Sequence, residues 1–302
     1  MSEQALTLQA LEKGRFERRL PWYLEMWVRL VKEKPLGTIG GILVLLVVIA
    51  AIIAPLITVY DPIENNTIMR LKGPSGAHWL GTDNFGRDMY TRIVYGARIS
   101  MYVSLGAVGI GTSFAVIVGI VSAYFGGLLD SIVQRFVDAL QALPWLVVML
   151  TIMAILGPGM NNVIIALVIG MVAGNSRIVR GATMSIKENA YVEAARCIGA
   201  GHLRIITRYM LPNVMAPVII IATIGLGGAI MAEASLSFLG YGVPPPAPSW
   251  GGMLSGAGRR YMLMAPWMAI FPGLALSLAI FGFNMLGDAL RDILDPRLRG
   301  SN

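Results

Sequence analysis

Long, largely uncharged apolar runs alternate with short polar segments along the 302 residues of this sequence. A helix needs about 20 apolar residues to cross a bilayer, because each residue advances it by about 1.5 Å. Gly157-Pro158-Gly159 separates two of these runs, because proline and flanking glycines end a helix. The pattern predicts an all-α integral membrane protein whose residues 36–300 form one six-helix transmembrane domain. We expect its transmembrane helices over residues 36–59, 99–125, 131–156, 163–179, 214–238 and 262–286.

Residues 1–35 are polar and basic and precede the first apolar run. Trp22, Tyr23, Met26 and Trp27 are interleaved with charged residues there, which favours an amphipathic helix in the membrane interface. A short soluble helix is the alternative. The basic lead is too long, and the apolar run too extended, for a usual signal peptide, so we expect an uncleaved first span.

Composition and charge agree with a membrane protein that has one basic side. Hydrophobic residues make up 56% of the chain and charged residues 14%, against about 25% charged in a soluble domain. With the six spans placed as above, 17 of the 24 Lys and Arg residues fall on the side of the two termini. Positive residues are retained in the cytoplasm, so we expect both termini and loop 181–212 to be cytoplasmic. Residues 60–98 and 241–260 are then outside, and the net charge of +7 requires no nucleic acid partner.

Charged residues near the outer side of the spans are candidates for a functional site. Asp83, Arg87, Asp88 and Arg92 recur at helical spacing, and we expect a charge ladder on a solvated helix face. Glu233 is the lone charge in the fifth run, and an intramembrane carboxylate is a functional candidate by default. Its position near the outer end leaves two interpretations open, a helix contact at the interface or a residue lining a pathway.

Groups typical of catalysis or metal binding are missing from the pattern. His78 and His202 lie far apart without companions at metal-ligand spacing, so we predict no metal site. Cys197 is the single cysteine, which excludes an internal disulfide, and we expect it to be a buried free thiol. The sequence contains no G-x-x-x-x-G-K followed by Ser or Thr, and no nucleophile–histidine set. We therefore expect no catalytic residues and no cofactor bound by this chain.

A polar, basic segment between the fourth and fifth spans carries the most specific motif. It combines Glu193-Ala194-Ala195, then Gly199, then Leu211-Pro212 directly before the next apolar run. Adjacent alanines let another backbone come close, a glycine permits a turn between two short helices, and a proline ends the second helix. An ordinary amphipathic cytoplasmic loop is the alternative interpretation.

These residues resemble the EAA loop of ABC importer permeases, a loop that docks on a cytoplasmic ATPase. Further blocks resemble the C-type subunit of the dipeptide, oligopeptide and nickel branch of that family, namely HWLGTD (78–83), GRD (86–88), YGARIS (95–100), GDALRD (287–292) and DPRLR (295–299). The resemblance implies a type I ABC importer permease fold. It also implies that ATPase docking falls on Glu193, Ala194, Ala195, Gly199, Leu211 and Pro212. Separately, the lone carboxylate at the end of an apolar run, followed by a proline-rich loop, leads us to hypothesise that Glu233 borders the translocation path.

The same resemblance implies a permease subunit that imports di- or oligopeptides delivered by an extracytoplasmic binding protein. Nickel, glutathione or another small solute is the alternative cargo. The implied partners are a second, homologous permease, two ATPase subunits that use ATP and Mg, the binding protein and the lipid bilayer. The implied location is the cell membrane of a prokaryote, which the chain crosses several times.

Two other classes of protein make different demands on the sequence. An ion-coupled secondary transporter needs ionisable residues in mid-span, and these are nearly absent here. A purely structural membrane scaffold needs no partner ATPase. Co-purification with two ATPase chains distinguishes the importer from both alternatives.

Overall fold

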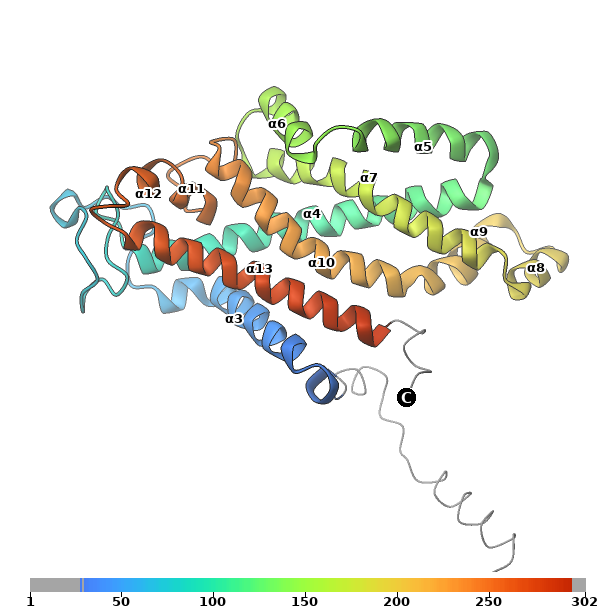
Figure 1. Cartoon of the computed structure of the whole chain (residues 1–302), viewed down its shortest axis with the longest axis horizontal. Coiled ribbons are helices and arrows are strands. Elements are labelled where there is room, and N and C mark those ends of the chain that lie inside the picture. The colour runs from blue at the N-terminus through green and yellow to red at the C-terminus, as the bar shows by residue number, and fades with distance from the viewer. Residues whose placement is uncertain (1–27, 29, 295–302) are drawn as a thin grey trace, which may run out of the picture.

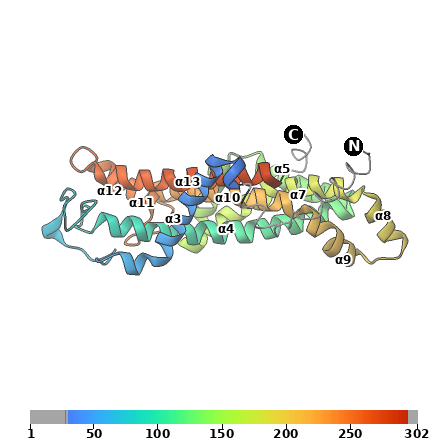
Figure 2. The same ribbon diagram turned by 90° about the horizontal axis from the view of Figure 1, so that it is seen from below.

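The computed structural model describes residues 28 and 30–294, and the secondary structure within them is almost entirely helical. The one β feature in this part of the chain is an isolated bridge between Thr82 and Asp88. The molecule is elongated, with α8 and α9 at one end and α11 and α12 near the other, and both views show this separation (Figures 1 and 2). The interfacial helix that we expect before residue 35 lies almost wholly outside the described residues.

Long helices joined by short ones make up the described chain. Five of them are long and apolar enough to cross a membrane, or six if the bent pair α5 and α6 counts as one span. The predicted break at 157–159 separates α6 from α7. The elements are α3 (Pro35–Ile57), η1 (Thr67–Met69), α4 (Met89–Phe125), α5 (Gly127–Gln141), α6 (Trp145–Leu156), α7 (Met160–Lys187), α8 (Ala190–Cys197), α9 (His202–Ile205), η2 (Ile206–Met210), α10 (Leu211–Phe238), α11 (Trp250–Leu254), α12 (Gly256–Arg260) and α13 (Trp267–Leu294).

The stretch 131–156, which we expect as one straight span, is instead bent by 90° between α5 and α6. Pro144 occupies the N-cap of α6, and a proline disfavours helical backbone in the residue before it. α5 is held on α7 by ion pairs, because Arg180 donates two hydrogen bonds to Asp130, at 2.7 and 2.5 Å. Arg135 and Asp138, the charged residues of the expected span, thus belong to α5, a separate helix that lies along α7.

Several helices extend beyond the uncharged runs that predict them. α4 begins at Met89, ten residues before the expected span at 99, and α7 continues to Lys187 instead of ending near 179. Asp88 caps α4, because its side chain accepts a hydrogen bond from the backbone N–H of Thr91 at 2.8 Å. An apolar window detects only the uncharged part of a helix, whereas caps and ion pairs extend the helix into polar sequence.

The helices pack as a layer that runs from α3 at one edge to α5 and α6 at the other (Figure 1). α4 packs most extensively against α7, while α13 lies between α3 and α10. α3 and α13 approach closely at Gly40, where an added Cβ would lie 2.8 Å from the carbonyl oxygen of Gly282. Small residues allow such close backbone contact between membrane helices, where burial of apolar surface gives little driving force.

The loops at the end opposite α8 are tied to the helices by two tryptophans. Trp250 is buried and donates from Nε1 to the carbonyl oxygen of Ile93 at 3.0 Å. Trp267 donates from Nε1 to the carbonyl oxygen of Thr82, also at 3.0 Å. Segments that are far apart in the sequence therefore form one packed structure, which we call the loop end and define as residues 58–88 and 239–266.

Candidate functional site

The segment between α7 and α10 forms a short helical hairpin, which we call the α8–α9 segment (residues 190–210). Gly199 turns the chain between its two helices with a φ of +76°, a left-handed conformation that favours glycine. A Cβ added at this position would meet no atom within 4 Å. The glycine is therefore needed for the backbone conformation and not for lack of space.

One face of the α8–α9 segment is buried against the helices beside it. Val192, Ile205 and Met210 pack in one apolar cluster with Ile120 of α4 and Val179 of α7. Burying three large apolar side chains contributes on the order of several kcal/mol, since each is worth about 1.5–3 kcal/mol. The hairpin is thereby fixed on the ends of two long helices.

Polar contacts add a second attachment of the α8–α9 segment to α4. The hydroxyl of Tyr124 lies 2.7 Å from Nδ1 of His202 and forms a hydrogen bond with it. The guanidinium of Arg196 lies over the Tyr124 ring, 5.6 Å from its centroid, in a cation–π contact. One tyrosine near the end of α4 thus contacts both short helices.

The opposite face of the α8–α9 segment is exposed and unoccupied by other described residues. Glu193 and Ala194 lie on it, and the Glu193 carboxylate forms no ion pair or hydrogen bond with any described side chain. Ile198 and Leu203 are 81% and 75% exposed beside them. Ala195 is buried, so only one of the two adjacent alanines lies on this face, contrary to our expectation for both. An exposed apolar tip beside a free carboxylate suits a protein partner with a basic groove.

Pro212 does not end the second short helix as the sequence led us to expect. α9, the π-helical turn η2 and α10 form one continuous helical stretch from His202 to Phe238. A proline clashes with the carbonyl four residues earlier, and the wider π turn directly before Leu211-Pro212 accommodates the ring. The carbonyl of Tyr209 accepts a hydrogen bond from Nδ2 of Asn213 at 2.6 Å. α9 and α10 are consequently joined by continuous helical backbone.

Glu233 is fully buried where α10 packs against α4. Its Oε2 accepts a hydrogen bond from Oγ of Ser100 at 3.0 Å, and its Oε1 accepts one from Oγ of Ser237 at 2.7 Å. Ser237 borders the cavity described next, whereas Glu233 does not. The Glu233 carboxylate thus links α10 to Ser100 of α4, and its place beside a pathway stays a prediction.

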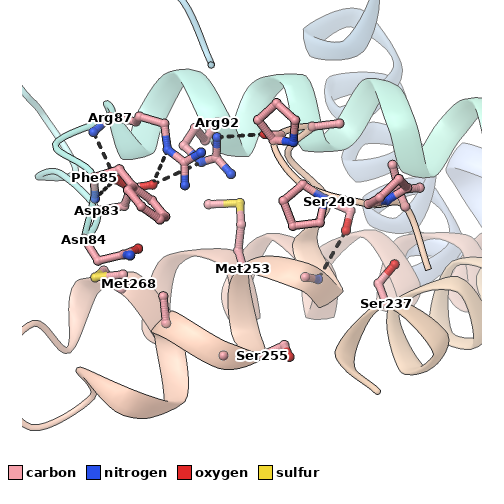
Figure 3. Close-up of a pocket in the computed structure, with 18 of the residues that line it drawn as sticks. Asp83, Asn84, Phe85, Arg87, Arg92, Ser237, Ser249, Met253, Ser255 and Met268 are labelled. Atoms are coloured by element: carbon pink, nitrogen blue, oxygen red, sulfur yellow. Dashed lines mark hydrogen bonds and ion pairs between the residues drawn. The ribbon is translucent and has the colours of Figure 1, made fainter. Parts of the chain in front are cut away.

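A cavity of about 960 Å³ opens among the loops and helices of the loop end. Figure 3 shows its walls, with Arg87 and Arg92 on the α4 side and Met253 and Met268 across from them. Three consecutive prolines, 244–246, form another part of the wall. The charged residues that line it are Asp83, Arg87, Arg92 and Arg260.

The charges of this cavity are buried and do not form the solvated ladder expected from their spacing. Asp83, Arg87 and Arg92 are only 4%, 9% and 6% exposed. Asp83 precedes α4 in a loop, where its Oδ1 accepts hydrogen bonds from the backbone N–H groups of Phe85 and Arg87 at 2.8 and 3.0 Å. The spacing of the four charged residues predicted a helix. The glycine at position 86 indicated instead a turn, and the loop folds back there before α4 begins.

One carboxylate oxygen faces two guanidinium groups in this cluster. Asp83 Oδ2 lies 2.7 Å from Nε of Arg87 and 3.5 Å from Nε of Arg92. Nη1 of Arg92 also donates to the carbonyl oxygens of Pro62 and Pro246, at 2.6 and 3.3 Å. Arg92 therefore joins the two segments of the loop end.

The histidines and the cysteine are the candidates for metal binding and thiol chemistry in the part of the chain that the structure describes. No group of three or more His, Cys, Asp and Glu residues is arranged there to hold a metal ion. His78 lies 2.9 Å from Asp88 through Nδ1 and serves the cap of α4. Cys197 is exposed, which corrects the expectation of a buried thiol.

Comparison with protein families gives two matches that together extend over most of the chain. The family described as binding-protein-dependent transport system inner membrane component matches residues 115–300. The N-terminal TM domain of oligopeptide transport permease C matches residues 21–74.

Similar proteins occur in several bacteria. The dipeptide transport system permease protein DppC of Alkalihalophilus pseudofirmus is 43% identical over 92% of this chain and 91% of its own length. The glutathione transport system permease protein GsiD of Pectobacterium atrosepticum is 40% identical over 93% of both chains. A chain of the MetNI methionine ABC transporter, solved in inward-facing conformations, matches with a TM-score of 0.56 and 18% identity. That match covers 68% of this chain and 98% of the other and concerns the fold alone.

Proposed function

This chain belongs to the family of inner membrane components of binding-protein-dependent transport systems, and we propose that it forms half of a translocation pathway for di- and oligopeptides. A component of this family is a permease subunit, and separate ATPase subunits of the importer hydrolyse ATP. The peptide cargo is supported by relatives named for dipeptide transport. Glutathione, itself a small peptide, is the second candidate because other relatives of similar identity are named for it.

The observation that carries this proposal is the construction of the α8–α9 segment. It exposes Glu193 and an apolar tip on one face and is anchored to α4 and α7 on the other. It also continues through η2 into α10 without a break. A partner that grips the exposed face can therefore tilt a long helix without bending the chain between them.

We infer from this construction a lever that couples ATP hydrolysis to transport. ATPase subunits that bind ATP and Mg dock on Glu193, Ala194 and neighbouring residues, and their closure moves the α8–α9 segment. The long helices then shift between inward- and outward-open states, which is a two-state transition biased at one end by nucleotide. The binding protein biases the same transition from the loop end.

The orientation and the partners belong to this proposal. The α8–α9 segment and both termini face the cytoplasm, and the loop end faces outward, as the distribution of Lys and Arg favours. A second, homologous permease supplies the other half of the pathway. This chain holds no cofactor of its own.

Co-expression with candidate ATPase and permease genes, followed by purification in mild detergent, tests the proposal. We expect two ATPase chains and one other permease to co-purify with this chain. In proteoliposomes with the binding protein, the complex should take up radiolabelled L-alanyl-L-alanine only when ATP is present. Uptake of glutathione but not of the dipeptide would select the second candidate, and uptake without any ATPase would contradict the importer.

A further inference from the structure

We propose that the cavity of the loop end binds the terminal carboxylate of the peptide, with Arg87 as the residue that holds it. The proposal deepens the proposed function, because it takes a peptide as the cargo and the loop end as the outer side. It assigns a ligand to a cavity at the opposite end of the molecule from the α8–α9 segment (Figure 1).

The charge balance of the cavity is the first argument. Both Arg87 and Arg92 contact the same carboxylate oxygen of Asp83, so one negative charge faces two positive charges. All three side chains are less than 10% exposed. A buried charge without a counter-charge is unfavourable, and an anion entering the cavity supplies the missing one.

The two arginines are not equally available to such an anion. Arg92 is engaged by Asp83 and by the carbonyl oxygens of Pro62 and Pro246. Among the described residues, Arg87 donates a side-chain hydrogen bond only from Nε, to Asp83, while its guanidinium lies over the Phe85 ring, 4.6 Å from the centroid, so its two terminal nitrogens are free to donate. A guanidinium presents paired N–H donors in the geometry that a carboxylate accepts, so Arg87 is suited to a bidentate contact.

The shape of the cavity selects a small peptide over a protein surface. Its volume of about 960 Å³ lies in the usual range for small-molecule sites, roughly 300–1,000 Å³. Arg87 lines the cavity and is only 9% exposed, so a flat partner has little access to it. Met253 and Met268 line the facing wall, and the flexible side chains of methionine adapt to ligands of different shape (Figure 3). A fixed charge contact beside an adaptable apolar wall suits peptides that share a terminal carboxylate and differ in their side chains.

Protection of a cavity cysteine from alkylation tests the site without relying on transport. Asn84 lines the cavity and is half-buried, so we place a cysteine there in a Cys197→Ser background. Thr67→Cys in the same background is the control, because Thr67 is exposed in the same loop but does not line the cavity. The complete complex is reconstituted in proteoliposomes without the binding protein and labelled with a membrane-impermeant maleimide.

We expect L-alanyl-L-alanine to slow the labelling of Asn84→Cys and to leave the labelling of Thr67→Cys unchanged. The C-terminal amide of the same dipeptide, which lacks the carboxylate, should not protect. With Arg87→Gln or Arg87→Lys added, half-protection should require a roughly tenfold to hundredfold higher dipeptide concentration. Arg87→Lys keeps the positive charge and loses the paired N–H donors. Weaker protection by the dipeptide in this variant would therefore show that the paired donors bind the carboxylate and that a positive charge alone is not sufficient.

The outcomes distinguish this proposal from the importer function. If the complex takes up the dipeptide but the dipeptide and its amide protect equally, the carboxylate site is wrong and the importer stands. If uptake and protection are both absent, the peptide cargo itself is wrong. If the binding protein alone protects Asn84→Cys through Arg87, an acidic side chain of that protein is the ligand, and the peptide site is overturned.

Discussion

At the level of single residues, Gly199 and Glu193 contribute to the α8–α9 segment in different ways. Gly199 determines the angle between two short helices through its φ of +76°. Glu193 places on the exposed face a carboxylate that forms no ion pair or hydrogen bond with any described side chain. The first residue is constrained by its own backbone, whereas the second is left free for another chain.

Gly199→Val should weaken ATPase docking, because a left-handed backbone costs about 1–2 kcal/mol for a residue with a Cβ and more for a β-branched one. Gly199→Asn is the matched control, since asparagine tolerates this conformation. We expect both variants to reach the membrane. The Val variant should retain less co-purified ATPase and lose substrate-stimulated hydrolysis, as measured on the purified complex. Full coupling in the Val variant would show that the turn is not part of the docking surface.

Glu193→Lys should reduce docking by placing like charge opposite a basic groove, a mismatch that costs on the order of several kcal/mol at an interface. Glu193→Gln keeps the shape and removes only the charge, so its loss should be intermediate. The measurement is the yield of ATPase that co-purifies with each variant at low and high salt. Equal yields for Lys, Gln and the unmodified chain would mean that Glu193 lies outside the docking surface.

At the level of elements, two junctions connect the helices through which we propose that movement of the α8–α9 segment travels. α9 continues into α10 through a π turn, and α10 is held to α4 by the hydrogen bond that Glu233 accepts from Ser100. We therefore propose that a shift of the α8–α9 segment reaches α4 by backbone continuity and then by the buried hydrogen bond between Glu233 and Ser100. Both junctions lie in helices whose apolar pattern alone showed only that they are spans.

Glu233→Gln should lower uptake while leaving assembly intact, because an amide NH₂ cannot accept from a serine hydroxyl and one contact must reverse its donor. Glu233→Leu leaves two buried hydroxyls unpaired, at a cost of about 1–3 kcal/mol each, and should also lower the melting temperature. Uptake in proteoliposomes and thermal unfolding in detergent separate the two effects. Normal uptake by the Gln variant at normal protein level would reduce Glu233 to a structural contact.

At the level of the whole molecule, the two ends differ in construction. The α8–α9 end is a short hairpin with an exposed face, and the loop end is a packed cap around a cavity that contains buried charges. An importer that receives cargo on one side of a membrane and energy on the other requires such a difference. The orientation of these ends is therefore the next property to test.

Labelling of single cysteines tests which end faces the cytoplasm. Cys197 is the only cysteine of the chain and is exposed on the α8–α9 segment. In cells lacking the ATPase subunits, an impermeant maleimide should label it only after permeabilisation. Ser75→Cys in a Cys197→Ser background lies in the loop end and should be labelled in intact cells. Labelling of Cys197 from outside, or none at position 75, would reverse the proposed orientation.

Local sequence was enough to predict five long apolar helices, the break at 157–159 and the turn at Gly199, but not the bend within 131–156. The backbone of a helix in lipid must satisfy its own hydrogen bonds, so any long uncharged run is helical whatever surrounds it. A glycine between two short amphipathic stretches likewise acts within its own few residues. The resemblance in the same segments indicated the permease family, which the comparisons confirm.

The burial of charged side chains and the continuity of helices could not be predicted from local sequence, because both depend on how distant parts of the chain pack. Arg92 is buried through carbonyl groups of Pro62 and Pro246, which lie 30 and 154 residues away, so its spacing from Arg87 said nothing about solvation. Pro212 was expected to end a helix, but a π turn before it lets the helix continue. A local sequence pattern indicates which secondary structure a segment can form. Tertiary packing decides which polar groups are paired and which charged groups have no counter-charge among the described residues.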